Sequence, residues 1–111
     1  MKEKRAYQYK DLEAAGIDTA LYAPMKAAGP FTATLDAKAW GRGMNMVLFL
    51  TLEGGEKVIT NVWQTTLCRN TDLPYMGMDE IPMGTKVEVA FSPNTKGKIC
   101  LADIRRIAPL V

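Results

Sequence analysis

The sequence predicts a mainly β protein, a small five-stranded antiparallel barrel preceded by a short helical N-terminal segment. Apolar and polar residues alternate over 31–40, which is the period of a half-buried strand. Two β-prone runs, 46–52 and 58–63, flank a Gly-Gly pair and form the strongest hairpin signal in the chain. A second pair of β-prone runs, 85–91 and 99–104, encloses a turn-forming stretch. Together these patterns supply five strands.

Length and composition set the domain organisation. The chain has 111 residues, of which 48% are hydrophobic and 23% charged, as in a globular domain with its own core. We expect a basic arm and short helical segment over 1–29 and a single β-barrel domain over 30–111. The net charge of +2 permits a nucleic-acid partner without requiring one, so such a contact would depend on local clusters of Lys and Arg.

The residue types that the chain lacks limit the kinds of catalytic and metal site that it can form. The chain has no His, which excludes catalysis by Ser-His or Cys-His and any His-ligated metal site. Cys68 and Cys100 belong to no Cys-x-x-Cys motif, and we expect both to be buried free thiols. Carboxylates such as Asp36, Asp79 and Asp103 form no recognisable pair. We therefore expect no enzyme, no metal and no cofactor.

The N-terminal residues and the longest apolar run bear on location. The first ten residues hold four cations and one anion. The apolar stretch that follows the basic start of a signal peptide is missing. The longest apolar run is much shorter than a membrane span. We expect a cytoplasmic protein with no membrane partner. The basic arm is expected to be a solvated tail, with phosphate binding as the alternative.

Residues 11–28 predict two short helical turns. The run 11–15 favours a turn that Gly16 ends, and Asp18 is placed to cap a second turn before Pro24. Apolar residues at helical spacing give the segment one face, formed by Ala14, Ile17 and Leu21. We expect that face to cover one end or side of the barrel.

The first strand, 31–40, is expected to have one apolar and one polar face. The apolar face consists of Phe31, Ala33, Leu35, Ala37 and Ala39, and the polar face of Thr32, Thr34, Asp36, Lys38 and Trp40. Trp40 then lies near solvent between Lys38 and Arg42, where an aromatic ring beside cations suits a base and its phosphates. The alternative is that Trp40 folds over the barrel mouth and joins the core.

The central hairpin is expected to have a two-residue loop at Gly54-Gly55. That register pairs Leu50 with Ile59 and Met46 with Trp63. The interior face then holds Met46, Leu48, Leu50, Leu52, Ile59, Asn61 and Trp63. The outer face holds Val47, Phe49, Thr51, Val58, Thr60 and Val62, which is too apolar to be bare. We expect this face to be covered by the N-terminal segment, a second subunit or stacked bases. As an alternative, a bulge at the glycines would swap the two faces of the hairpin.

Residues 64–84 predict a long irregular connection, because Pro74, Gly77 and Pro82 prevent a long helix. Four apolar residues in this stretch favour packing, namely Met76, Met78, Ile81 and Met83. We expect a plug at one end of the barrel, or else a partner surface.

The order of these strands resembles the OB-fold over about residues 30–107. In that family the outer surface of the second and third strands binds the ligand, flanked by the loops after the first and fourth strands. The resemblance implies a basic and aromatic groove for single-stranded DNA or RNA. Its residues would be Lys38, Trp40, Arg42, Phe49, Thr60, Lys96 and Lys98.

A second pattern is similar to the signatures of Sm-like RNA-binding proteins. It comprises Phe31-x-x-Thr34-Leu35-Asp36, then Met44-Asn45-x-x-Leu48, and later Leu67-Cys68-Arg69-Asn70-x-x-Leu73. This resemblance implies an Sm/SH3-like barrel in which Asn45 and Arg69 line a uridine pocket. Gly41 stands where the family has Asp, and the strand pair over 87–107 falls outside that fold.

Two functions from different classes follow. The first is single-stranded nucleic-acid binding, in which phosphates meet Lys38, Arg42, Lys96 and Lys98 while bases stack on Trp40 and Phe49. The second is a non-enzymatic structural or assembly protein that forms a homo-oligomer through its apolar outer sheet face.

Overall fold

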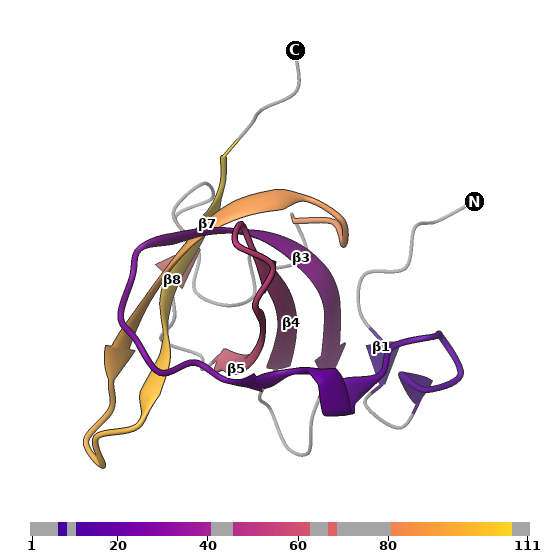
Figure 1. The fold of residues 1–111 in the computed structure, drawn as a ribbon, viewed down its shortest axis with the longest axis horizontal. Coiled ribbons are helices and arrows are strands. Elements are labelled where there is room, and N and C mark those ends of the chain that lie inside the picture. The colour runs from indigo at the N-terminus through magenta and orange to yellow at the C-terminus, as the bar shows by residue number, and fades with distance from the viewer. Residues whose placement is uncertain (1–6, 9–10, 41–45, 63–66, 69–80, 108–111) are drawn as a thin grey trace.

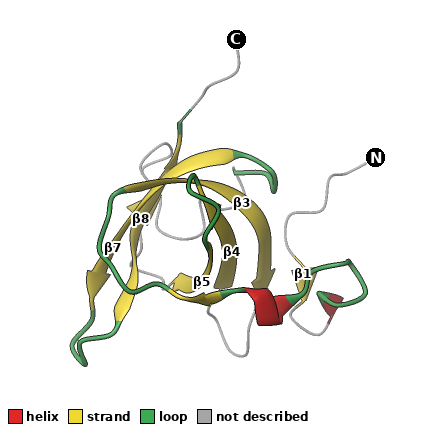
Figure 2. Ribbon diagram, viewed as in Figure 1, coloured by secondary structure: helices red, strands yellow, loops and turns green. Residues whose placement is uncertain are grey.

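The computed structural model describes residues 7–8, 11–40, 46–62, 67–68 and 81–107. This part of the chain is mainly β, and its helix is confined to short turns of the N-terminal segment (Figure 2). The elements are β1 (Tyr7–Gln8), η2 (Thr19–Leu21), β2 (Ala23–Pro24), β3 (Phe31–Trp40), β4 (Met46–Leu52), β5 (Lys57–Val62), β6 (Leu67–Cys68), β7 (Lys86–Pro93) and β8 (Ile99–Arg106).

The five long strands form one curved sheet with β3 at its centre (Figure 1). The order is β2-β5-β4-β3-β7-β8-β6, and β1 pairs with β3 outside this path. The predicted barrel is wrong in one respect, because the sheet is not closed by continuous strand pairing. Among the described strands no ladder joins β5 to β8. A hydrogen bond from the Leu101 N–H to Thr60 Oγ1, 3.2 Å long, bridges the two strands instead.

The N-terminal segment forms turns in place of the predicted helical face. Asp18 caps η2 as expected, since its side chain accepts a hydrogen bond from the Ala20 N–H at 3.1 Å. Leu12 and Met25 are the buried residues of the described part of this segment, whereas Ala14 is exposed, Ile17 is half-buried and Leu21 is 59% exposed. The segment nevertheless covers one side of the sheet, as predicted. A single 3-10 turn is too short to present an apolar face at helical spacing.

A β-bulge in β3 overturns the predicted faces of that strand. Leu35 pairs with Leu50 and Ala37 with Phe49, so Asp36 is an extra residue that has no counterpart on β4. A bulge shifts the alternation by one position. Ala33 and Leu35 lie in the inner core as expected, but Ala37 and Ala39 lie on the outer face.

The β4–β5 hairpin has a three-residue loop, one residue longer than predicted. Leu52 donates to the Glu56 carbonyl at 2.7 Å, and Gly55 donates to the Leu52 carbonyl at 2.8 Å. Leu50 therefore pairs with Val58 and Met46 with Val62, so the predicted partners Ile59 and Trp63 are wrong. The faces of β5 are exchanged, as the alternative expected, but the longer loop is the cause, because the β4–β5 pairing contains no register shift. The interior residues of β5 are Val58, Thr60 and Val62, while Trp63 lies outside the described residues.

The inner core fills the concave side of the sheet. Val87, Val89 and Phe91 of β7 point inward as predicted, and Ile81 from the long connection is fully buried among them. The other members are Met25, Ala33, Leu35, Met46, Leu48, Leu50, Leu52, Val58, Val62, Leu101 and Ile104. Cys100 is a half-buried free thiol where a buried one was expected. The structure does not describe the side chain of Cys68, and Met76 and Met78 lie outside the described residues.

Candidate functional site

Lys38 does not lie on the solvent face where the sequence placed it. The bulge at Asp36 turns Lys38 inward, and its side chain is 1% exposed. Its Nζ donates to the Ile81 carbonyl at 2.8 Å. A side chain enclosed in this way is not placed to meet phosphate at the surface.

Thr60 also lies inside the sheet and is 6% exposed. Its hydroxyl accepts the hydrogen bond from Leu101 that bridges β5 and β8. The one-residue difference in the hairpin register is the reason, since it exchanges the two faces of β5. Thr60 is thus a structural residue of the seam and is not part of an outer ligand face.

Phe49 faces outward as predicted, but it is covered. The outer cluster consists of Leu12, Ala37, Ala39, Val47 and Phe49, with Ile17, Tyr22, Ile59 and Met83 at its edges. Phe49 is 0% exposed and Val47 is 7% exposed. The N-terminal segment is therefore the main cover of this face. The face that an apolar homo-oligomer interface or stacked bases would need is occupied within the chain.

A polar network fastens this cover to the sheet. The Tyr22 hydroxyl donates to Asp36 Oδ2 at 2.7 Å, and the Thr51 hydroxyl donates to the same oxygen. Lys57 Nζ lies 3.0 Å from Thr51 Oγ1, 3.9 Å from Asp36 Oδ2 and 5.3 Å from the centre of the Tyr22 ring. The Tyr22 ring meets Phe49 edge to face, with centroids 5.1 Å apart. Burial, and then the hydrogen bond and charge of Asp36, raise the pKa of Tyr22 from 10.0 to about 12.

The sequence patterns did not single out Tyr22, Thr51 or Lys57. Each is an ordinary polar residue on its own segment, and the three meet at Asp36 only when the N-terminal segment folds over β3, β4 and β5. The segment carries exposed carboxylates on its outer side, at Asp11, Glu13 and Asp18. Negative charges at these positions disfavour contact with phosphate on this side of the molecule.

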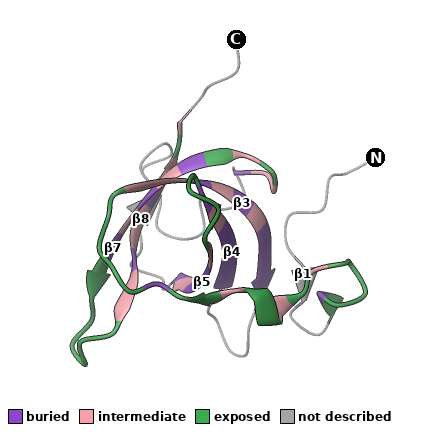
Figure 3. Ribbon diagram, viewed as in Figure 1, coloured by how far each residue is buried: buried purple, intermediate pink, exposed green. Residues whose placement is uncertain are grey.

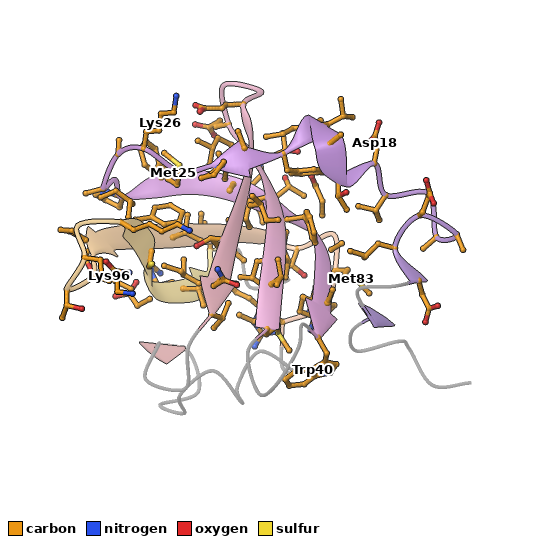
Figure 4. The ribbon with its side chains drawn as sticks, turned by 90° about the horizontal axis from the view of Figure 1, so that it is seen from below. Asp18, Met25, Lys26, Trp40, Met83 and Lys96 are labelled. Carbon is orange, nitrogen blue, oxygen red and sulfur yellow. The ribbon has the colours of Figure 1, made fainter. Side chains whose placement is uncertain are left out.

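Trp40 and the lysines of the β7–β8 turn lie far apart. Trp40 and Lys96 lie in opposite directions from the Phe31–Val89 pair, because β3 and β7 are antiparallel. Figure 4 shows Trp40 at the end of β3 and Lys96 at the tip of the other hairpin, well separated. Lys96 and Lys98 are exposed, and their N–H groups donate to Asn94 Oδ1 at 2.8 and 2.9 Å. The single groove implied by the sequence is therefore not assembled.

Trp40 remains an aromatic candidate, because it is only half-buried where Phe49 is fully covered. Its side chain packs against the inner core, as one alternative expected. The residue also stays partly exposed, as the other alternative expected. The short strand β1 runs parallel to the end of β3, with Tyr7 opposite Ala39 and Gln8 opposite Trp40. Arg42, Asn45 and Arg69 lie outside the described residues, and the Sm-like pocket stays a prediction.

Comparison of the chain with protein-family models, curated proteins and solved structures finds no match. Within the described ranges, no group of three or more His, Cys, Asp or Glu side chains lies close enough together to hold a metal ion. The same part of the chain contains no helix that is long and apolar enough to cross a membrane.

Proposed function

We propose that this chain has an OB-like, incompletely closed sheet and binds single-stranded nucleic acid at the Trp40 end of β3. The support for an OB-like fold is the arrangement of the five long strands, in which β3 lies between β4 and β7 and the sheet stays partly open at β5 and β8. The proposed contact surface differs from the groove that the sequence suggested, because Lys38, Phe49 and Thr60 are buried.

The pairing of β1 with the end of β3 is the observation that carries the proposal. It brings Tyr7 and Gln8, which belong to the most basic ten-residue stretch of the sequence, opposite Ala39 and Trp40. Arg5 precedes Tyr7 by two residues and Lys10 follows Gln8 by two. Arg42 follows Trp40 at the same interval.

In this mechanism a base stacks on the accessible part of the Trp40 ring, and the cations meet the phosphates. Stacking on an aromatic ring contributes about 1–3 kcal/mol per base with little sequence preference. The phosphate contacts release counterions, so binding weakens as the salt concentration rises. The expected ligand is a short stretch of single-stranded DNA or RNA.

The test compares two substitutions at Trp40 that both fill its place against the core. Trp40→Leu removes the aromatic surface and should weaken binding of a labelled single-stranded oligonucleotide by roughly tenfold or more. Trp40→Phe keeps a smaller stacking surface and should retain most of the affinity. Fluorescence anisotropy at low, fixed ionic strength measures the dissociation constants, and a thermal melt of each variant verifies folding.

Two further variants serve as controls for the position of the surface. Lys96→Ala, at the remote hairpin tip, should leave the affinity unchanged. Lys4→Ala with Arg5→Ala should lower the slope of log affinity against log salt by about two. Equal losses for the Leu and Phe variants, or salt-independent binding, would contradict the proposal.

A further inference from the structure

The β7–β8 hairpin ends in a two-stranded ribbon that no third strand accompanies. β3 pairs with β7 only as far as Val89, and β6 pairs with β8 no nearer the turn than Asp103. β7 and β8 stay paired with each other out to Pro93 and Ile99. We call residues 92–98 the ribbon tip, and among the described strands only β7 and β8 form it. Figure 1 shows the hairpin extending beyond the rest of the sheet, and Figure 3 shows its tip fully exposed.

Asn94 fixes the shape of the ribbon tip. Its backbone N–H donates to the Lys98 carbonyl at 2.8 Å, and its carbonyl accepts from the Gly97 N–H at 2.9 Å. Its side-chain Oδ1 accepts the N–H groups of Lys96 and Lys98 at 2.8 and 2.9 Å. The backbone that carries the two lysines is therefore preorganised, which lowers the entropy cost of binding a ligand.

The side chains of the ribbon tip suit an anionic ligand. They are Ser92, Pro93, Asn94, Thr95, Lys96, Gly97 and Lys98. The sequence has no carboxylate between Glu88 and Asp103, so the charges of the tip itself are all positive. The tip lacks the aromatic and large apolar side chains that protein interfaces and membrane anchors use. Hydroxyl and ammonium donors are the groups that bind the phosphates of nucleic acids.

We infer that the ribbon tip is a further nucleic-acid site, one that enters the major groove of double-stranded DNA. The major groove of B-form DNA is about 12 Å wide and admits a two-stranded β-ribbon. The groove is about 8.5 Å deep. Residues 92–95 span about 10 Å at about 3.4 Å per residue, so the tip is long enough to reach the base edges. In this position Lys96 and Lys98 meet the phosphates that border the groove.

This site is separate from the surface at Trp40 and takes a different form of nucleic acid. Trp40 and Lys96 lie well apart (Figure 4). A single strand has no major groove, so Lys96 and Lys98 should not contribute to the single-strand binding proposed at Trp40. The inference therefore does not depend on the proposed function, and either can fail without the other.

The test measures binding of a short, labelled, blunt-ended DNA duplex to the full chain by fluorescence anisotropy at low, fixed ionic strength. Lys96→Gln with Lys98→Gln should weaken duplex binding by roughly tenfold and lower the slope of log affinity against log salt by about two. Lys86→Gln with Arg106→Gln is the matched control. It removes two exposed charges at the opposite end of the hairpin, and it should leave duplex binding unchanged. A thermal melt of each variant verifies folding.

An RNA duplex of the same sequence tests whether the groove is entered. The major groove of A-form RNA is too narrow for side chains to read, so the RNA duplex should bind roughly tenfold more weakly than the DNA duplex. Asn94→Ala keeps both lysines and removes the acceptor that fixes the turn. It should weaken binding of the DNA duplex while leaving the salt slope unchanged.

The outcomes separate this inference from the proposed function. Duplex binding that ignores the substitutions at Lys96 and Lys98 would overturn the inference, and the lysines would then only keep the free edges of the ribbon from pairing with other strands. Equal binding of the DNA and RNA duplexes, or no binding of the DNA duplex, would also overturn it. If duplex binding depends on the ribbon tip while single-strand binding ignores Trp40→Leu, the ribbon site stands and the proposed function fails.

Discussion

At the scale of single residues, Asp36 determines how the outer face is closed. It is the extra residue of the bulge in β3, and its Oδ2 accepts hydrogen bonds from Tyr22 and Thr51. Lys57 lies within 3.9 Å of the same oxygen. The N-terminal segment and both strands of the β4–β5 hairpin thus meet at one carboxylate, and the Tyr22 ring is held over Phe49 as a result.

The raised pKa of Tyr22 predicts a loss of stability at alkaline pH. The folded protein holds the Tyr22 proton more tightly than the unfolded chain, because the pKa rises from 10.0 to about 12 on folding. The resulting stabilisation is complete below about pH 10 and is lost as the pH rises toward about 12. Urea unfolding across this interval should show a steeper decline for the unsubstituted protein than for Tyr22→Phe. Parallel declines would show that Tyr22 titrates alike in both states.

At the scale of elements, the β4–β5 hairpin decides which residues of β5 enter the core. Gly55 closes the three-residue loop with φ +97°, in the left-handed region that favours glycine. The extra loop residue moves the register by one position relative to a two-residue loop. Since side chains alternate with a period of two, Thr60 turns inward and Ile59 outward.

The two glycines of this loop should respond differently to substitution. Gly55→Ala places a Cβ in the left-handed region and should lower the free energy of unfolding by about 1–2 kcal/mol. Gly54 has no such φ, and a Cβ there meets nothing within 4 Å, so Gly54→Ala serves as the matched control. We expect the control to stay within about 0.5 kcal/mol of the unsubstituted protein in denaturant titrations. Equal effects at the two positions would contradict the three-residue loop.

At the scale of the whole molecule, the seam between β5 and β8 distinguishes this sheet from a closed barrel. The Thr60 hydroxyl stands in for a backbone acceptor and receives the Leu101 N–H at 3.2 Å. Both residues are buried, so the bond lies out of water. Removing it should loosen the contact between the two ends of the sheet.

Thr60→Val tests the seam, because valine has nearly the same shape and no hydroxyl. The substitution should lower the free energy of unfolding by about 1 kcal/mol. Amide hydrogen exchange at Leu101 should accelerate in Thr60→Val and stay slow in Thr60→Ser, which keeps the hydroxyl. Unchanged exchange in Thr60→Val would show that another contact holds the seam.

Local patterns were sufficient to predict the five long strands, the β7–β8 hairpin with Val87, Val89 and Phe91 inward, and the Asp18 cap. They were not sufficient for the faces of β3 and β5. Alternation over ten residues carries no sign of an extra residue in one strand, and a Gly-Gly pair suits a loop of two or three residues equally well. Lys38 and Thr60 were assigned to an accessible groove for this reason, whereas Phe49 faces outward as predicted and is covered by the N-terminal segment.

The sequence by itself determined that this protein is mainly β, because strand and turn preferences are encoded in neighbouring residues. Tertiary structure alone decided which candidates are accessible. Asp36 shifts the pairing of β3 against β4, and the N-terminal segment closes over Phe49, through contacts between residues far apart in the chain. Burial depends on those contacts, so the partial exposure of Trp40 and the packing of Tyr22 over Phe49 emerge only in the folded molecule.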